Sequence, residues 1–216
     1  MPFGLTNAPA LFQEMMDAIF KDMEGCIWYL DDIFIYGGDT EAEHQAIVEK
    51  VLQQCIEHGL TVNLLKSKFH VKESIFLVHL INGQEVMMDP SKLETMSKWP
   101  IPTKKKEVLA FLGFANYYRR FIVNYSAKAR LLIDLTNDVP FTWGHTQQQA
   151  FDELRTRFLS APILTQFDRT LKTIMKTDAS NQAIAGILSQ YHVVNGCKQL
   201  HSVEYHAKTL SATQRN

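Results

Sequence analysis

The 216-residue sequence predicts an α+β fold made of more than one structural unit. Three observations support this class. Apolar residues recur every three to five positions in several segments, as they do on one face of a helix. Short apolar runs bounded by glycine or Asn-Gly pairs indicate strands and hairpin turns. Along the chain these patterns give helix and hairpin, then helices, then strands.

The first expected elements are a helix over residues 11–23 and a strand hairpin over Cys26 to Tyr36. Pro9 precedes the helix, where a first helical turn tolerates proline. The hairpin run is apolar except for Asp31-Asp32, and Gly37-Gly38 ends it. This pattern predicts two short buried strands joined by a tight turn near the acid pair.

A second helix is expected to begin at the capping box Thr40-x-x-Glu43 and to stop at Gly59. Its expected inward residues are Ile47, Val51, Leu52 and Ile56. Residues 69–88 indicate short strands, with Asn82-Gly83 as a hairpin turn.

Three further helices are expected in the middle of the chain. Asp89-Pro90 opens one that ends before Pro100, and Thr103 starts the next. The core face of this second helix is expected to contain Val108, Leu109, Phe111 and Leu112. Thr146-x-x-Gln149 caps a third helix, which closes before Pro162.

The tail returns to a strand pattern. Strands are expected over Lys172–Thr177, Gln182–Val194 and Leu200–His206, with Asn195-Gly196 as a turn candidate. The sequence contains no internal repeat and no low-complexity tract.

Composition is that of an ordinary globular chain, with 46% hydrophobic and 21% charged residues, which argues against disorder. No apolar run reaches the ~18 residues that a membrane span requires. The N-terminus lacks the basic region and apolar core of a signal peptide. Cys26, Cys55 and Cys197 are odd in number and form no CxxC pair, which suggests a reducing compartment and neither a disulfide framework nor a zinc site. With no signal peptide or membrane span, an intracellular location in the cytoplasm or nucleus is expected.

The net charge of −1 hides a strong asymmetry. Residues 1–60 carry eleven acids and two bases, a balance of −9. Residues 92–130 carry nine bases and two acids, a balance of +7. Such a distribution suits divalent metal at one place and a polyanion at another, although two solvated faces of opposite charge would give the same balance.

Asp31-Asp32 is the first candidate for chemistry. Carboxylates buried in so apolar a stretch need compensation, and Mg²⁺ supplies it, because this ion binds one or two carboxylates together with substrate phosphate oxygens. The alternative is an exposed hairpin turn, since aspartate is a common turn residue.

The second candidate is the stretch 104–130, where bases alternate with aromatic residues. Its bases are Lys104, Lys105, Lys106, Arg119, Arg120, Lys128 and Arg130. Its aromatic residues are Phe111, Phe114, Tyr117, Tyr118 and Tyr125. Bases neutralise phosphates and exposed rings stack on nucleobases, but helical spacing favours core packing for Phe111 and Phe114.

Four ordered motifs carry a resemblance to a known family. They are Met-Pro-Phe-Gly-Leu-Thr-Asn-Ala-Pro at residues 1–9, Tyr-Leu-Asp-Asp at 29–32, Phe-Leu-Gly-Phe-Ala-Asn-Tyr-Tyr-Arg-Arg-Phe at 111–121 and Thr-Asp-Ala-Ser at 177–180. Their order and spacing resemble the reverse transcriptase and ribonuclease H polyproteins of gypsy-class long-terminal-repeat retrotransposons. The chain is similar to an internal fragment of such a polyprotein.

The resemblance implies roles for residues of the polymerase. Asp31 and Asp32 would be catalytic and would bind the two Mg²⁺ ions of nucleotidyl transfer, with Tyr29 near the primer end. Phe3 and Gly4 match the loop beneath the incoming nucleotide, where close approach favours glycine.

Further roles are implied elsewhere. Lys66 matches a lysine that faces the nucleotide phosphates, with a solvated turn lysine as the alternative. Arg119 and Arg120 match the thumb that holds the duplex. Asp178 matches the first catalytic, metal-binding carboxylate of ribonuclease H, with an ordinary aspartate at a strand end as the alternative.

The implied domains are a partial palm at 1–88, a thumb at 89–140, a connection helix at 141–165 and the N-terminal part of a ribonuclease H-like domain at 166–216. The implied partners are an RNA template, a DNA primer and an RNA–DNA hybrid. No membrane is expected as a partner.

The chain also departs from the family pattern. In the family a further palm carboxylate and the fingers lie upstream, and further ribonuclease H carboxylates lie downstream, so activity of these 216 residues alone is not expected. Val78, Lys176 and Glu204 replace the usual glycine, acidic and small apolar residues, and a valine fits poorly in a turn that requires positive φ. A non-enzymatic nucleic-acid-binding remnant and an inert product of a decayed element are the alternatives.

Overall fold

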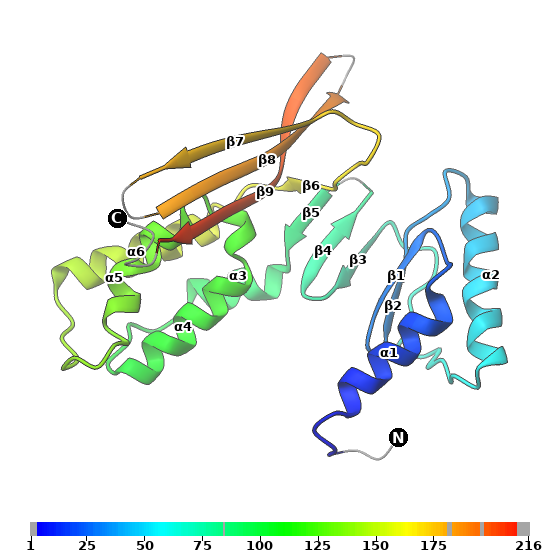
Figure 1. Ribbon diagram of the computed structural model, residues 1–216, viewed down its shortest axis with the longest axis horizontal. Coiled ribbons are helices and arrows are strands. Elements are labelled where there is room, and N and C mark those ends of the chain that lie inside the picture. The colour runs from blue at the N-terminus through cyan, green and yellow to red at the C-terminus, as the bar shows by residue number, and fades with distance from the viewer. Residues whose placement is uncertain (1–3, 84, 181–182, 195–196, 211–216) are drawn as a thin grey trace. The chain divides into compact units, whose positions relative to one another are not determined.

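The computed structural model describes residues 4–83, 85–180, 183–194 and 197–210 (Figure 1). The chain forms two compact units, Met1–Val71 and Lys72–Asn216. Each unit has its own cluster of buried apolar side chains.

The first unit consists of α1 (Ala8–Phe20), β1 (Cys26–Tyr29), β2 (Asp32–Ile35) and α2 (Glu41–Glu57). The two strands form an antiparallel hairpin, as predicted. The buried residues of the first unit are Met16, Phe20, Cys26, Val51 and Cys55. The predicted burial of both strands is only half correct, because one hairpin face packs on the helices and the other is exposed.

The base of this hairpin depends on two glycines. The Gly37 amide donates to the Gly25 carbonyl at 2.8 Å. A Cβ on Gly37 would lie 2.5 Å from the Gly25 Cα, closer than packed atoms approach. Gly37 therefore permits the close approach of two backbone segments, in addition to ending the strand.

The capping box of α2 is confirmed. The Thr40 hydroxyl accepts from the Glu43 amide at 3.3 Å, and the Glu43 carboxylate accepts from the Thr40 amide at 3.0 Å. The inward position predicted for Ile56 is wrong, because its side chain is 73% exposed and Cys55 is buried in its place. Val51 and Cys55, four residues apart, form the inner line of the helix.

The second unit contains two antiparallel sheets. One has the order β3-β4-β5-β6, from β3 (Glu73–Phe76), β4 (His79–Asn82), β5 (Glu85–Met88) and β6 (Leu164–Thr165). The other has the order β7-β8-β9, from β7 (Thr173–Ala179), β8 (Ala183–Val194) and β9 (Cys197–Thr209). A turn does separate β4 from β5, but of the predicted pair Asn82-Gly83 only Gly83 lies in it, because Asn82 belongs to β4 and pairs with Glu85. The predicted turn at Asn195-Gly196 lies outside the described residues.

Helices fill the rest of this unit. They are α3 (Pro90–Ser97), α4 (Lys105–Tyr117), the 3₁₀ turn η1 (Arg119–Phe121), α5 (Tyr125–Asp134) and α6 (His145–Leu159). Their core is rich in aromatic rings, and Phe111 and Phe151 are both fully buried, with ring centroids 4.6 Å apart.

Two details of these helices differ from expectation. Leu109 is 55% exposed and does not belong to the core face of α4, whereas Ala115 is buried there. Helix α6 is capped two residues earlier than predicted: its N-cap is Gly144, whose amide donates to the Gln147 side chain at 3.2 Å. The Thr146-x-x-Gln149 pattern therefore lies inside the helix.

The β7-β8-β9 sheet packs on these helices through β9 (Figure 1). Val203 is buried, and the Ser126 hydroxyl donates to the Ala207 carbonyl at 2.8 Å. Strand β6, which follows α6, pairs with β5. The expected thumb, connection and sheet therefore share one compact unit, and the finer division at residues 88, 140 and 165 stays a prediction.

Candidate active site and nucleic-acid interface

The acid pair lies at the tip of the β1–β2 hairpin. Tyr29 pairs with Asp32, so that Leu30 and Asp31 form a tight two-residue turn in which Leu30 has a φ of 50°. Both aspartates are exposed. Of the two readings left open by the sequence, the structure has the exposed hairpin turn, so no desolvation of these carboxylates has to be compensated.

Two side chains of α1 brace this tip. The Leu30 amide donates to the Gln13 side chain at 2.8 Å, and the Gln13 amide group donates to Asp17 at 2.7 Å. The same Asp17 oxygen accepts from the Trp28 indole at 2.8 Å. Sequence reasoning missed this brace, although the spacing of Gln13 and Asp17 places them on one helix face.

The strand pairing decides which side chains share a face of the hairpin. Directly paired residues lie on the same face, so Asp32 and the 51%-exposed Tyr29 are neighbours on the outer one. Trp28 and Ile33 face the core. The outer face thus presents a carboxylate next to an aromatic ring, with a second carboxylate, Asp31, in the adjoining turn.

Exposed carboxylate oxygens on adjacent residues suit a hard cation, because Mg²⁺ binds one or two protein carboxylates and completes its shell with water and phosphate oxygens. Within the described part of the chain, no group of three or more His, Cys, Asp or Glu side chains could hold a metal ion. Asp31 and Asp32 therefore fit a Mg²⁺ site in which other groups provide the remaining ligands.

The other predicted nucleotide-binding residues are partly described. Gly4 is exposed and has a φ of +92°, a conformation that favours glycine. Phe3 lies outside the described residues. Lys66 is exposed, and its backbone amide donates to the Asn63 carbonyl at 3.1 Å, which places it in a turn closed by Asn63.

Asp178 is an exposed residue of β7, where it pairs with Ala185 of β8. Strand β7 is at the edge of its sheet within the described residues. His192 lies on β8, and His201 and His206 lie on β9.

The arginine pair predicted to contact duplex lies in η1. Arg119 is exposed and Arg120 is half-buried, with its guanidinium 5.9 Å from the centroid of the Phe121 ring. The Arg120 Nε is buried without a hydrogen-bond partner among the described residues.

Ion pairs reduce the basic character of the 92–130 segment. Lys98 and Lys104 pair with Glu94 and Glu107, within the segment. Lys128 and Arg130 instead pair with acids outside it, Glu153 and Asp134. The sequence balance of +7 therefore overstates the charge that is free to meet a polyanion, and the exposed Arg119 gains in relative importance.

Most aromatic residues of this segment are structural. Phe111 is fully buried and Phe114 packs against the same core, as expected. Tyr118 and Tyr125 are buried too, and burial raises the pKa of both hydroxyls, that of Tyr125 to about 12. Tyr117, at 49% exposure, is the ring of this set with the most surface available to a partner.

The β3–β4 turn has an uncommon backbone. Leu77 and Val78 have φ values of 46° and 60°, so both are left-handed. This conformation costs residues with a Cβ about 1–2 kcal/mol each, and two-residue hairpin loops of this kind usually contain Asn-Gly. The sequence objection to valine here is thus upheld, and strain is present in the turn.

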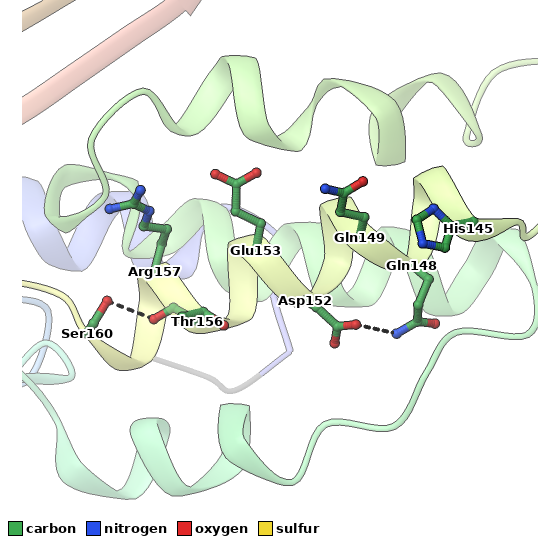
Figure 2. Close-up of a pocket in the computed structure, with 8 residues that line it drawn as sticks. All are labelled: His145, Gln148, Gln149, Asp152, Glu153, Thr156, Arg157 and Ser160. Atoms are coloured by element: carbon green, nitrogen blue, oxygen red, sulfur yellow. Dashed lines mark hydrogen bonds between the residues drawn. The ribbon is translucent and has the colours of Figure 1, made fainter.

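An open polar groove of about 650 Å³ runs along α6 (Figure 2). Gln148 donates to Asp152 at 2.8 Å, and the Ser160 hydroxyl donates to the Thr156 carbonyl at 2.9 Å. Glu153 binds Lys128, which lowers the pKa of its carboxyl. None of the predicted site residues lines this groove. Among the described residues, no helix has the length and apolar character to cross a bilayer.

Comparison with known proteins agrees with this architecture. Residues 1–116 match the family model described as reverse transcriptase (RNA-dependent DNA polymerase). Residues 143–216 match the RNase H-like domain found in reverse transcriptase.

Among solved structures, the foamy viral protease-reverse transcriptase in complex with RNA/DNA hybrid superposes with a TM-score of 0.82 at 26% identity, covering 100% of this chain and 29% of that one. Its complex with dsDNA gives 0.80 at 25% identity, covering 100% and 44%.

Among curated proteins, the chain is 36% identical over 222 residues to the retrovirus-related Pol polyprotein from transposon 297 of Drosophila melanogaster. It is 34% identical to that from transposon opus of the same species and 32% identical to the Tf2-3 polyprotein of Schizosaccharomyces pombe. All of this chain is matched, and it spans 20%, 22% and 16% of these relatives. The chain belongs to the reverse transcriptase family of retrotransposon Pol polyproteins, with reverse transcriptase sequence followed by an RNase H-like domain.

Proposed function

We propose that this chain supplies the metal-binding hairpin and part of the duplex-binding surface of an RNA-directed DNA polymerase, followed by part of its ribonuclease H. One observation carries this proposal. Two adjacent carboxylates, Asp31 and Asp32, are exposed at a hairpin tip that Gln13 and Asp17 hold from α1. The tip lies within the residues that match reverse transcriptase.

In this role Asp31 and Asp32 hold Mg²⁺, and bound metal ions would activate the primer hydroxyl and stabilise the leaving pyrophosphate. Tyr29, on the same hairpin face as Asp32, would contact the primer end. Phe3 and Gly4 would support the incoming nucleotide, and the Lys66 ammonium would attract its phosphates.

Arg119 and Arg120 would contact the backbone of the primer–template duplex, including an RNA–DNA hybrid. Charge-assisted bonds from guanidinium to phosphate are strong and often bidentate. Asp178 would contribute one carboxylate to the ribonuclease H metal site. Its exposure on an edge strand leaves it accessible to an ion that other carboxylates also bind.

The metal role can be tested on the 216-residue chain with Mn²⁺, a paramagnetic substitute for Mg²⁺. Substoichiometric Mn²⁺ should broaden the amide NMR signals of residues 29–34. Asp31→Asn with Asp32→Asn should abolish this broadening, whereas Asp39→Asn, an exposed acid of the same unit, should leave it unchanged. Broadening that survives the double substitution would refute the site.

Primer extension gives a second test. We expect no Mg²⁺-dependent extension of a DNA primer on an RNA template by these 216 residues alone, because the described residues contain no group of three or more side chains that could hold a metal ion. Primer extension by the parent chain that is lost in Asp31→Ala would contradict this expectation.

Binding without catalysis is the second candidate function, and the exposed Arg119 favours it. Affinity for a B-DNA duplex should fall with salt, with a slope of roughly −0.9 in log K per neutralised phosphate. Arg119→Ala with Arg120→Ala should make the slope less steep by about 1.8. Lys98→Ala, which removes a base already paired with Glu94, is the matched control. An unchanged slope in the arginine variant would exclude this surface.

A further inference from the structure

Three polar groups hold the left-handed β3–β4 turn from outside. The Leu77 carbonyl accepts from the Tyr117 hydroxyl at 2.8 Å and from the His79 Nδ1 at 2.7 Å. The Val78 carbonyl accepts from the Tyr118 hydroxyl at 3.2 Å. Both carbonyls of the strained turn are thus engaged, by the last residue of α4, Tyr117, and by its C-cap, Tyr118, each 40 residues away in sequence.

Aromatic packing fixes the donors in place. The His79 ring lies with its centroid 5.7 Å from each of the rings of Tyr117, Tyr118 and Phe121. Tyr118 and Phe121 are fully buried. The end of α4, η1 and the turn therefore form one packed cluster within the second unit.

The chemistry of the contact assigns the His79 proton. A carbonyl only accepts hydrogen bonds, so Nδ1 must carry the hydrogen and neutral His79 presents Nε2 as an acceptor. Burial lowers the pKa of His79, and the charge of Arg120 lowers it further. The His79 Nε2 and the Arg120 Nε are both buried without a partner among the described residues. Arg120 is thereby linked electrostatically to the cluster that holds the turn.

We propose that Tyr117 and Tyr118 are positioning residues that clamp the β3–β4 turn to the end of α4 and to η1, which carries Arg119 and Arg120. The clamp holds turn and arginines as one rigid surface for a nucleic-acid backbone. This inference rests on the proposed duplex contact of Arg119 and Arg120. The tyrosine hydroxyls stabilise the turn through their hydrogen bonds, because neither Leu77 nor Val78 favours the left-handed backbone conformation that the turn adopts.

A substitution at Tyr117 can distinguish a role in positioning the turn from a role in folding. The Tyr117 ring is 49% exposed, so removal of its hydroxyl leaves the core packing unchanged. Tyr117→Phe keeps the ring beside His79 and removes only the bond to the turn. Tyr125→Phe is a matched control, because the Tyr125 hydroxyl also donates to a backbone carbonyl, that of Leu112 at 3.2 Å, away from the turn.

The experiment uses the 216-residue chain, amide hydrogen exchange by NMR and a fluorescently labelled 20-base-pair DNA duplex. In Tyr117→Phe, exchange at Leu77, Val78 and His79 should accelerate about three- to tenfold, as expected for loss of one hydrogen bond. Duplex affinity should fall by a similar factor while the melting temperature stays near that of the parent. Adding Leu77→Asn, which tolerates left-handed backbone, should restore slow exchange and affinity. Tyr125→Phe should alter neither the turn exchange nor the affinity.

Unchanged exchange at the turn in Tyr117→Phe would overturn the clamp. Faster exchange with parental affinity would also overturn it, because the turn would then not be part of the binding surface. Duplex binding that is lost in the Arg119→Ala, Arg120→Ala variant but unchanged in Tyr117→Phe would refute the clamp and leave the proposed function standing. A parent chain that binds no duplex would refute the duplex contact itself and the positioning role with it.

Discussion

Gln190 offers the sharpest test of how the β7-β8-β9 sheet is held. This side chain of β8 is fully buried. Its carbonyl oxygen accepts from the Asp168 amide at 2.9 Å, and its amide group donates to the Asp168 carbonyl at 2.7 Å and to the Thr173 hydroxyl at 3.1 Å. Gln190 therefore ties the segment that leads into β7, the strand of Asp178, to the neighbouring strand.

The magnitude follows from these three bonds. Gln190→Met keeps the volume and removes these three bonds, each of which contributes about 0.5–1.5 kcal/mol to the free energy of unfolding, together with a longer bond of 3.4 Å to the Leu171 carbonyl. The expected loss is roughly 2–4 kcal/mol, or roughly 4–16 °C in melting temperature for a chain of this size. Gln190→Glu should be less stable still near pH 7, because a buried carboxylate would face the Asp168 carbonyl.

The assay is thermal unfolding by circular dichroism between pH 5 and pH 8. The Gln190→Glu variant should regain stability as the pH falls, because burial raises the pKa of its carboxyl and the protonated form can donate again. The Gln190→Met variant should not show this additional gain. Gln199→Met, an exposed glutamine of β9, should change stability by no more than about 0.5 kcal/mol. A Gln190→Met variant that melts with the parent would refute the assigned role of these bonds.

Three further predictions follow from single features. The pKa of His79 is lowered from 6.5 in the folded chain, so the contribution of His79 to stability should be complete above pH 6.5 and should decline as the pH falls further. Urea unfolding at several pH values should show this decline, and His79→Gln should abolish it. Thr40→Ala should destabilise the first unit by about 1 kcal/mol, and Thr40→Ser by much less, as measured by urea unfolding. Equal losses in the two variants would contradict the role of Thr40 as a helix cap. Gly37→Ala should accelerate amide exchange throughout the β1–β2 hairpin, because its Cβ would meet the Gly25 backbone; unchanged exchange would show that the close approach is dispensable.

Short sequence patterns correctly predicted the structural elements that depend only on neighbouring residues. The Thr40 capping box, the Asp89 helix start and the Asp31-Asp32 hairpin all form as predicted, because each is completed within a few residues. The motifs at 29–32 and 111–121 led to the family for a related reason: their residue types and spacing are visible in the chain itself.

Side-chain environment could not be obtained in this way. Ile56 and Leu109 lie one position from buried residues, and helical spacing alone did not show which neighbour faces the core. The charge of the 92–130 segment was misjudged because Glu153 and Asp134, which pair with two of its bases, lie outside it.

The sequence by itself determined the family, the fold class and the location of the acid pair at a hairpin turn. Only the tertiary structure showed that this tip is exposed and braced by Gln13, and that Tyr117 and Tyr118 hold the left-handed turn at Leu77. The physical reason is the sequence separation between the residues that interact. A cap or a hairpin is closed by residues nearby, whereas a hydrogen bond across 40 residues exists only after the sheet and the helices have packed together.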